Sequence, residues 1–325
     1  MAKILLTGVA GFIGSHLYNK LVQKHDVIAI DNLSTFSNFA IKQQRAQLLF
    51  GNNLTDSRFY TIDIEDESSL NALFEKEKFE AVIHLAALTG VRESIKNPSM
   101  YEKVNVNGFL SILEACKTFN VTKLIYASSS SVYGGHKEIP FRETATIDNL
   151  LNYYAVTKRM NELAAENYAN LYDINAFGLR FFTVYGPWTR PDMATYTFIK
   201  NILEGKPITL FNDGELKRDF TYVDDIILSI DLLLSKLLYD TPIEKHMIFN
   251  IGEGKPILIK EYVSLLEKFL NKKALITYAP MNKEEMVCTF ADCNKLFNYI
   301  GYKPQTTVEE GLLKTVDWYL KTFNY

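Results

Sequence analysis

The pair of side chains best suited to proton transfer is a phenol and an ammonium group four residues apart, Tyr154 and Lys158. On a helix this spacing brings both side chains to one face. The reference pKa of tyrosine is near 10, so a tyrosine that acts as a general base at neutral pH needs a lowered pKa, which a neighbouring cation can provide. Because a Y-x-x-x-K spacing also arises by chance, its meaning depends on the rest of the chain.

Three glycines, Gly8, Gly11 and Gly14, follow a predicted strand over 3–7 and open a predicted helix over 14–24. Glycine lets the backbone come close where a Cβ would obstruct, and a pyrophosphate binds well against a helix N-terminus. The spacing is a variant of the G-x-G-x-x-G dinucleotide fingerprint. A tight strand-to-helix turn without a ligand is the alternative interpretation.

An acidic residue, Asp31, ends the next predicted strand, over 26–30. In a dinucleotide-binding fold a carboxylate at this position accepts hydrogen bonds from the adenosine ribose hydroxyls and repels a 2′-phosphate. Asp31 therefore favours NAD over NADP. A bound, positively charged nicotinamide would then join Lys158 in lowering the pKa of Tyr154.

Four consecutive serines, 128–131, stand at the end of a further predicted strand, over 123–128. Their hydroxyls would lie at the carboxyl edge of the sheet, where ligands bind in open α/β folds. The alternative is that these serines cap the turn that follows.

Short β-branched runs alternate with amphipathic stretches, and a further strand is predicted over 81–85. The alternation predicts an α/β fold, a Rossmann-type doubly wound parallel sheet with a smaller C-terminal α/β substrate-binding domain. We expect an NAD-binding domain over 1–180, with later strands contributed from about 220–255, and an interleaved substrate-binding domain over 181–325.

Two long helices are predicted from mixed three- and four-residue apolar spacing, over 98–119 and 153–172. In the second, Leu163, Ala164, Tyr168 and Leu171 form one stripe.

The composition is that of an ordinary globular protein, with 325 residues, 47% hydrophobic residues, 22% charged residues and a net charge of −3. No dense run of basic residues or long apolar stretch points to nucleic acid or a membrane as partner. Three cysteines without C-x-x-C spacing fit reduced thiols that serve in packing. We expect a cytoplasmic protein without a metal site.

Taken together, the glycine triplet, Asp31, the serines and the Tyr154/Lys158 pair resemble the extended short-chain dehydrogenase/reductase family in order and spacing. The resemblance runs nearly end to end, and its later motifs are similar to the NAD-dependent nucleotide-sugar epimerase branch. These motifs are Leu85-Ala86-Ala87, Asn105-Val106-Asn107-Gly108, Arg180-Phe181-Phe182-Thr183-Val184-Tyr185-Gly186-Pro187 and Arg218-Asp219-Phe220-Thr221-Tyr222-Val223-Asp224-Asp225.

The resemblance implies roles for single residues. Tyr154 would be the base, Ser129 would bridge the sugar O4, and Lys158 would bind the nicotinamide ribose and hold Tyr154 anionic. Arg218 would reach the nucleotide phosphates, unless it forms a salt bridge with Asp219 or Asp225. The residues expected to contact NAD are Gly8, Gly11, Phe12, Ile13, Gly14, Asp31, Asn32, Asp63, Ile64, Leu85, Ala86, Ala87, Asn105, Tyr154, Lys158 and Phe182.

The residues before Val132 bear on the reaction. Related dehydratases and UDP-glucuronate decarboxylases usually have an acidic residue just before the V-Y-G, where this chain has Ser130 and Ser131. With no carboxylate to assist elimination, the simple outcome is rotation of a 4-keto sugar and hydride return, which is 4-epimerisation. Ser130 is also expected to contact the sugar. A dehydratase, a decarboxylase and a binding protein that has lost catalysis are the alternatives.

The segment 184–194 is very similar to a loop of UDP-glucuronate 4-epimerases. Thr183 and Arg190 could receive a C6 carboxylate through charge-assisted hydrogen bonds. Arg190 could instead brace the loop by pairing with Asp192. The predicted substrate is UDP-glucuronate, interconverted with UDP-galacturonate, and the alternatives are UDP-glucose and UDP-N-acetylglucosamine.

One segment departs from the family pattern, and the family also suggests how the chain assembles. Lys283-Glu284-Glu285 stands where relatives often have a Gly-Asp pair before the late Ala-Asp motif. Members of the family often dimerise through two helices per subunit, and a homodimer through the helices over 98–119 and 153–172 is expected here.

Overall fold

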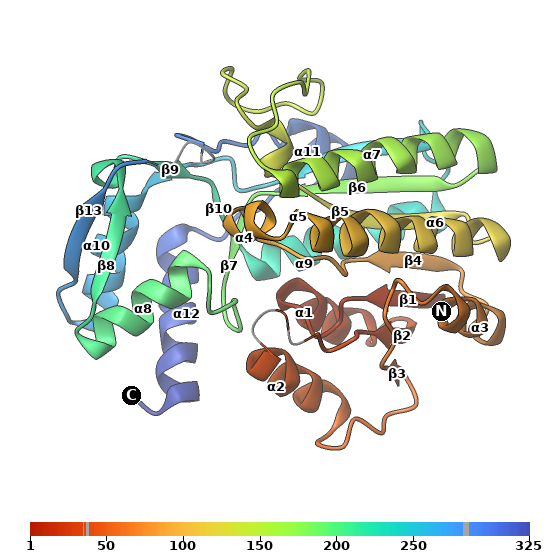
Figure 1. Ribbon diagram of the computed structural model, residues 1–325, viewed down its shortest axis with the longest axis horizontal. Coiled ribbons are helices and arrows are strands. Elements are labelled where there is room, and N and C mark those ends of the chain that lie inside the picture. The colour runs from red at the N-terminus through yellow and green to blue at the C-terminus, as the bar shows by residue number, and fades with distance from the viewer. Residues whose placement is uncertain (35, 37–38, 282–285) are drawn as a thin grey trace. The chain divides into compact units, whose positions relative to one another are not determined.

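The chain forms two compact units in a computed structural model that describes residues 1–34, 36, 39–281 and 286–325 (Figure 1). The expectation for Lys283-Glu284-Glu285 lies outside the described residues. Both units are discontinuous in sequence. The first comprises Met1–Gly134, Thr146–Arg180 and Ile230–Phe249, and the second comprises Gly135–Ala145, Phe181–Ser229 and Asn250–Tyr325.

The central sheet is seven-stranded, in the order β11-β6-β5-β4-β1-β2-β3. Neighbouring strands from β5 to β3 are parallel. This is the predicted Rossmann-type sheet. Its strands are β1 (Lys3–Thr7), β2 (Asp26–Ile30), β3 (Phe59–Tyr60), β4 (Ala81–His84), β5 (Lys123–Ser129), β6 (Asn175–Phe181) and β11 (His246–Ile251).

Four of these strands were predicted from sequence, and their nearly continuous burial explains why. β1 and β2 have the predicted bounds, β4 is one residue shorter and β5 one residue longer. Continuous apolar runs are typical of parallel strands that helices cover on both faces.

Helices α3, α6 and α7 cover one face of the sheet and share a core with it. α6 and α7 run side by side along this face (Figure 1). The helices of the first unit are α1 (Phe12–Leu21), α2 (Phe39–Phe50), α3 (Glu67–Glu77), α4 (Val91–Lys96), α5 (Pro98–Tyr101), α6 (Gly108–Thr118) and α7 (Tyr153–Tyr172), and α9 (Val223–Tyr239) belongs to both units.

Two features of the predicted long helices need correction. The helix expected over 98–119 is α5, a π-helical turn over Glu102–Asn107 and α6 in succession. The apolar stripe predicted on α7 is divided: Ala164 and Tyr168 pack against the core, whereas Leu163 is 50% exposed and Leu171 is 63% exposed. The buried face of α7 carries small and polar residues, Ala155, Thr157, Lys158, Asn161, Glu162, Ala165 and Ala169.

The second unit is built from short strands and helices around an aromatic core. The Tyr262 ring stacks on Phe220 at 4.0 Å between centroids, and Tyr185 meets both rings edge-on. Its strand pairs are β7 (Thr183–Tyr185) with β10 (Phe220–Tyr222), β8 (Pro207–Phe211) with β13 (Leu275–Ala279), and β9 (Lys217–Arg218) with β12 (Ile257–Leu258). Its other helices are α8 (Ala194–Glu204), α10 (Ile259–Leu270), α11 (Asn294–Ile300) and α12 (Val308–Phe323).

Within the described part of the chain, none of the helices has the length and apolar character needed to cross a membrane.

Candidate functional site

The turn between β1 and α1 accepts only glycine at two positions. Gly8 has φ +72°, and a Cβ there would lie 2.7 Å from the Ala86 backbone nitrogen. A Cβ at Gly14 would lie 2.2 Å from the Gly8 carbonyl oxygen. Gly11 caps α1 without a side chain, so Phe12 and Ile13 begin the helix with no side-chain oxygen over their N–H groups. This is the backbone that a pyrophosphate needs at a helix N-terminus.

The Asp31 carboxylate at the end of β2 binds this turn. Asp31 is 6% exposed, its Oδ2 accepts a hydrogen bond from the Ala10 N–H at 3.1 Å, and its Oδ1 accepts one from the Leu33 N–H at 2.9 Å. A carboxylate has about four acceptor sites, so these two bonds leave capacity for ribose hydroxyls. The adjacent Asn32 donates from Nδ2 to Asp63 Oδ2 at 2.9 Å, while Ile64 is buried in the core beside them.

A threonine and a histidine that the sequence analysis missed organise the end of β4. Thr7 Oγ1 accepts hydrogen bonds from the Leu85 and Ala86 N–H groups at 3.2 and 3.1 Å, and it lies 2.9 Å from His84 Nδ1. Burial, with a smaller contribution from the Lys158 charge, lowers the pKa of His84 to about 3. The imidazole is therefore neutral at pH 7, and its Nδ1 shares a hydrogen bond with the Thr7 hydroxyl. The Leu85-Ala86-Ala87 segment is thus held by Thr7.

Asn105 fastens two segments of the first unit. Its side chain is 1% exposed, its Oδ1 accepts from the Leu88 N–H at 2.7 Å, and its Nδ2 donates to the Leu88 carbonyl at 2.9 Å and to Thr157 Oγ1 at 3.1 Å. Asn105 therefore joins the loop after β4 to α7.

Tyr154 and Lys158 lie one turn apart at the start of α7. Asn152 caps this helix by accepting a hydrogen bond from the Ala155 N–H at 2.9 Å. The Tyr154 side chain is half-buried, whereas Lys158 is 2% exposed and donates from Nζ to the Ala127 carbonyl at 3.0 Å. Burial lowers the pKa of Lys158 to about 8, against the charge of Glu162, which raises it. Lys158 is therefore a cation at pH 7, held beside the tyrosine.

Ser129 is the last residue of β5 and is 8% exposed. Its Oγ accepts from the Ser131 N–H at 3.1 Å and lies 3.1 Å from Ser131 Oγ, so it caps the 3-10 turn that follows. The capping role considered from sequence is therefore present. The neighbouring Ser130 is 7% exposed. A serine that caps a turn at the carboxyl end of a strand can still offer its hydroxyl to a ligand there.

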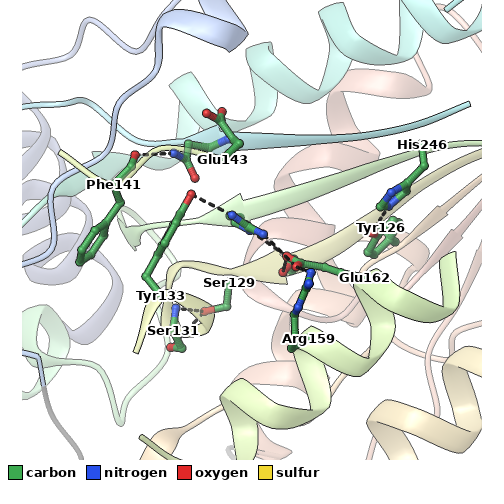
Figure 2. A network of polar contacts seen from close by, with 12 residues as sticks. Tyr126, Ser129, Ser131, Tyr133, Phe141, Glu143, Arg159, Glu162 and His246 are labelled. Atoms are coloured by element: carbon green, nitrogen blue, oxygen red, sulfur yellow. Dashed lines mark hydrogen bonds and ion pairs between the residues drawn. The ribbon is translucent and has the colours of Figure 1, made fainter. Parts of the chain in front are cut away.

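The sequence analysis missed a buried ion pair between Glu162 on α7 and Arg180 on β6 (Figure 2). Glu162 accepts hydrogen bonds from Arg180, Arg159 and Ser128 Oγ, and Arg180 also donates to the Tyr133 hydroxyl at 3.0 Å. A signal was available, because a carboxylate four residues after Lys158 on a helix shares its face.

The second unit holds three of the predicted substrate-contacting residues, Thr183, Arg190 and Arg218, whereas Ser129 and Ser130 belong to the first unit. Thr183 begins β7 and donates from its backbone N–H to the Asp219 carbonyl at 3.1 Å, and the preceding Phe182 is 5% exposed. Arg190 Nε and Nη2 pair with the Asp192 carboxylate at 3.2 and 2.7 Å. The loop-bracing interpretation of Arg190 is therefore the arrangement found.

Arg218 donates from Nη1 to the Lys217 carbonyl at 2.9 Å. The carboxylates considered as its partners bind elsewhere. Asp219 accepts from the backbone N–H groups of Glu253, Gly254 and Ala291, and Asp225 accepts from the Tyr302 hydroxyl and the Thr306 N–H.

The structure thus brings two groups of predicted residues together, each within its own unit. In the first unit the glycine turn, Asp31, residues 85–87, Ser129 and Lys158 lie at or beyond the carboxyl ends of β1, β2, β4 and β5. In open α/β sheets this is where a dinucleotide binds. In the second unit Phe182 and Thr183 stand at the start of β7, and Arg218 ends β9.

Comparisons with known proteins agree with this geometry. Residues 4–252 match the model of the NAD dependent epimerase/dehydratase family. A UDP-glucuronate 4-epimerase of Thermodesulfobacterium geofontis is 41% identical, over 98% of this chain and 96% of the relative.

Two solved structures extend the comparison. The UDP-glucuronic acid 4-epimerase of Bacillus cereus, in complex with UDP-glucuronic acid and NAD, has a TM-score of 0.90 and 35% identity over 98% of this chain and 99% of that chain. The UDP-glucose 4-epimerase of Thermotoga maritima, with UDP-glucose, has a TM-score of 0.87 and 30% identity over 99% of each chain.

Proposed function

Because the chain belongs to the NAD dependent epimerase/dehydratase family, we propose that it is an NAD-dependent 4-epimerase that interconverts UDP-glucuronate and UDP-galacturonate. The observation that carries this proposal is end-to-end similarity to UDP-glucuronate 4-epimerases, in sequence and in structure. The buried Lys158 beside Tyr154, at the edge of the sheet that would bind NAD, supports the same chemistry.

The reaction assigns a task to each of three residues. Tyr154, held anionic by the Lys158 charge, removes the proton from the sugar O4. Ser129 donates a hydrogen bond to the same oxygen and steadies it as the C4 carbonyl forms. When bound, NAD would supply the acceptor for the hydride from C4 and, as NADH, its donor in the reverse transfer, so that no net oxidation results.

The residues present fit NAD. Gly8 and Gly14 form a turn that a Cβ would fill, and the Asp31 carboxylate retains acceptor capacity for the adenosine ribose. We assign NAD binding to the domain over 1–180 with later strands from about 220–255, and nucleotide-sugar binding to the interleaved domain over 181–325. NAD would also contact Asn32, Asp63, Ile64, residues 85–87, Asn105 and Phe182.

The sugar nucleotide would be held by Thr183, Arg190 and Arg218. The Arg190 guanidinium, already oriented by Asp192, would offer a cation to the C6 carboxylate, and Arg218 would pair with the phosphates. Ser130 would contact the sugar.

The two alternatives to this function are a lyase and a 4-epimerase of another UDP-sugar. Related dehydratases and decarboxylases usually have an acidic residue before the valine that corresponds to Val132, where this chain has Ser130 and Ser131. A 4-epimerase of a neutral or N-acetylated UDP-sugar is the other alternative. The similarity to the Thermotoga UDP-glucose 4-epimerase supports a neutral sugar, and it is lower in both identity and TM-score than the similarity to the Bacillus enzyme.

We also propose that the protein is a cytoplasmic homodimer. The outer surface of α6 and α7 supports the dimer, because it exposes large apolar side chains that a second copy could cover. They are Leu110, Met160, Leu163, Leu171 and Tyr172. The cytoplasm fits three cysteines that are all free thiols.

A substrate panel tests the proposal. Purified protein is incubated separately with UDP-glucuronate, UDP-glucose and UDP-N-acetylglucosamine, and kcat/KM for 4-epimerisation is compared. UDP-glucuronate should exceed the other two by at least about tenfold, since a paired carboxylate contributes about 1.5 to 3 kcal/mol. A higher value for a neutral sugar would overturn the assignment of the substrate.

A further inference from the structure

The Glu162 carboxylate lies in the interior of the first unit, on the face of α7 that carries Lys158. Glu162 is 1% exposed, and it follows Lys158 by one helical turn, which places the two side chains as neighbours on one face. Burying a carboxylate is unfavourable unless hydrogen bonds and opposite charges compensate.

That compensation is complete and comes from three elements. Glu162 accepts from Arg159 Nη1 on α7 at 3.0 Å (Figure 2). It also accepts from Arg180 Nε and Nη2 on β6 at 2.8 and 2.9 Å and from Ser128 Oγ on β5 at 2.7 Å. Burial alone would raise the pKa of Glu162, but the hydrogen bonds and charge of Arg180 outweigh it and hold that pKa below its usual range. Glu162 is therefore ionised at neutral pH.

The same strand end connects Glu162 to the reacting side chains. Ser128, which donates to Glu162, stands between Ala127, whose carbonyl accepts the Lys158 hydrogen bond, and Ser129. The carboxylate thus contacts the peptide segment that receives the Lys158 ammonium.

We propose that Glu162 is a positioning residue that keeps the buried Lys158 in its ammonium form and acts through it on Tyr154. The proposal rests on the proposed function only for the role of Tyr154 as the base. Without Glu162, the buried Lys158 ammonium would lose the negative charge that stabilises it, and Arg159 and Arg180 would lose their common partner.

Two further titratable groups among the described residues near this cluster are uncharged. His84 on β4 is neutral, since burial lowers its pKa to about 3, and Tyr126 on β5 stays a phenol, since burial raises its pKa well above its usual range. Arg159 and Arg180 are cations. Of the neighbours named here, Glu162 carries the compensating negative charge.

An exposed glutamate on the same helix offers a matched control. Glu166 lies one turn beyond Glu162 and is solvent-exposed. Glu166→Gln makes the same chemical change as Glu162→Gln, but its charge is screened by water.

The experiment is an NMR titration of protein labelled with ¹³C at lysine Cε, in the form in which it is purified. Lys158→Arg identifies the Lys158 resonance, and no sugar substrate is added. In Glu162→Gln the midpoint of the Lys158 titration should fall by at least about one pH unit, whereas Glu166→Gln should leave it in place. A midpoint in folded Glu162→Gln that stays within about 0.3 units of the original protein would overturn the proposal.

If Glu162→Gln does not fold, Arg159→Gln tests the same proposal. Arg159 has a side chain 31% exposed and donates one hydrogen bond to Glu162. Arg159→Gln removes a cation that offsets the carboxylate, so the Lys158 midpoint should rise by about half a pH unit. An unchanged midpoint would contradict the proposal. Because the titration needs no sugar, it gives the same answer whether or not UDP-glucuronate is the substrate, and failure of the proposed function is recognised separately by the substrate panel.

Discussion

Lys158 Nζ donates a hydrogen bond to the carbonyl oxygen of Ala127 at 3.0 Å, so the helix that carries Tyr154 is joined to the strand that ends in Ser129. The lysine is 2% exposed, and its charge is therefore little screened by solvent. In the proposed mechanism this contact holds the cation that supports the Tyr154 tyrosinate, so activity is expected to depend on the protonation of Lys158.

The pH dependence of activity should follow Lys158. Burial lowers its pKa to about 8, so its positive charge is present below that pH and is lost as the pH rises through it. Accordingly, kcat/KM should fall above about pH 8, by up to about tenfold per pH unit. Arginine stays charged at every accessible pH, so Lys158→Arg should be less active but should lack this fall. If kcat/KM falls above the same pH in the original protein and in Lys158→Arg, a group other than Lys158 causes the fall.

Tyr154→Phe should lower kcat by about 10²- to 10⁴-fold, because the phenyl ring cannot remove a proton. Tyr172→Phe, near the end of the same helix and 39% exposed, is the control and should retain kcat. Both variants should melt within a few degrees of the original protein. Comparable kcat in the two variants would exclude Tyr154 as the base.

Gly14→Ala should destabilise the cofactor turn, because its Cβ would lie 2.2 Å from the Gly8 carbonyl oxygen. We expect a loss of about 2 kcal/mol or more in the free energy of unfolding and loss of copurifying NAD. Gly205→Ala is the control, since it has φ +67° but no atom within 4 Å of the new Cβ, and strain alone costs about 1 kcal/mol. Urea unfolding and the cofactor absorbance measure both effects. Retention of NAD by Gly14→Ala would show that this turn does not hold the cofactor.

Arg190→Ala should weaken activity on UDP-glucuronate far more than activity on UDP-glucose. The loss of a charge-assisted pair corresponds to about 10- to 150-fold in kcat/KM. Asp192→Asn separates the two roles of Arg190, because it removes the bracing partner and leaves the guanidinium. It should therefore keep more activity on UDP-glucuronate than Arg190→Ala. Equal losses on both sugars in both variants would restrict Arg190 to bracing the loop.

Much of the first unit could be predicted from sequence, because the apolar runs and the glycine spacing point to the same fold. Continuous apolar runs predict the buried strands, and the glycine spacing predicts the turn whose backbone leaves no room for a Cβ. The apolar stripe of α7 predicts its packing only in part, because Ala164 and Tyr168 pack against the core but the buried face also carries Lys158 and Glu162, which pattern rules assign to solvent. The pairing of Arg180 with Glu162 joins residues 18 positions apart on a helix and the following strand, and only the folded sheet brings them together.

The most direct test of the central claim is to incubate the purified protein with UDP-glucuronate and to follow the sugar products by NMR. The account predicts that UDP-galacturonate accumulates until the two sugars reach equilibrium, while added NAD⁺ is not consumed. Appearance of a UDP-pentose, or of a stable 4-keto sugar with stoichiometric formation of NADH, would contradict the account.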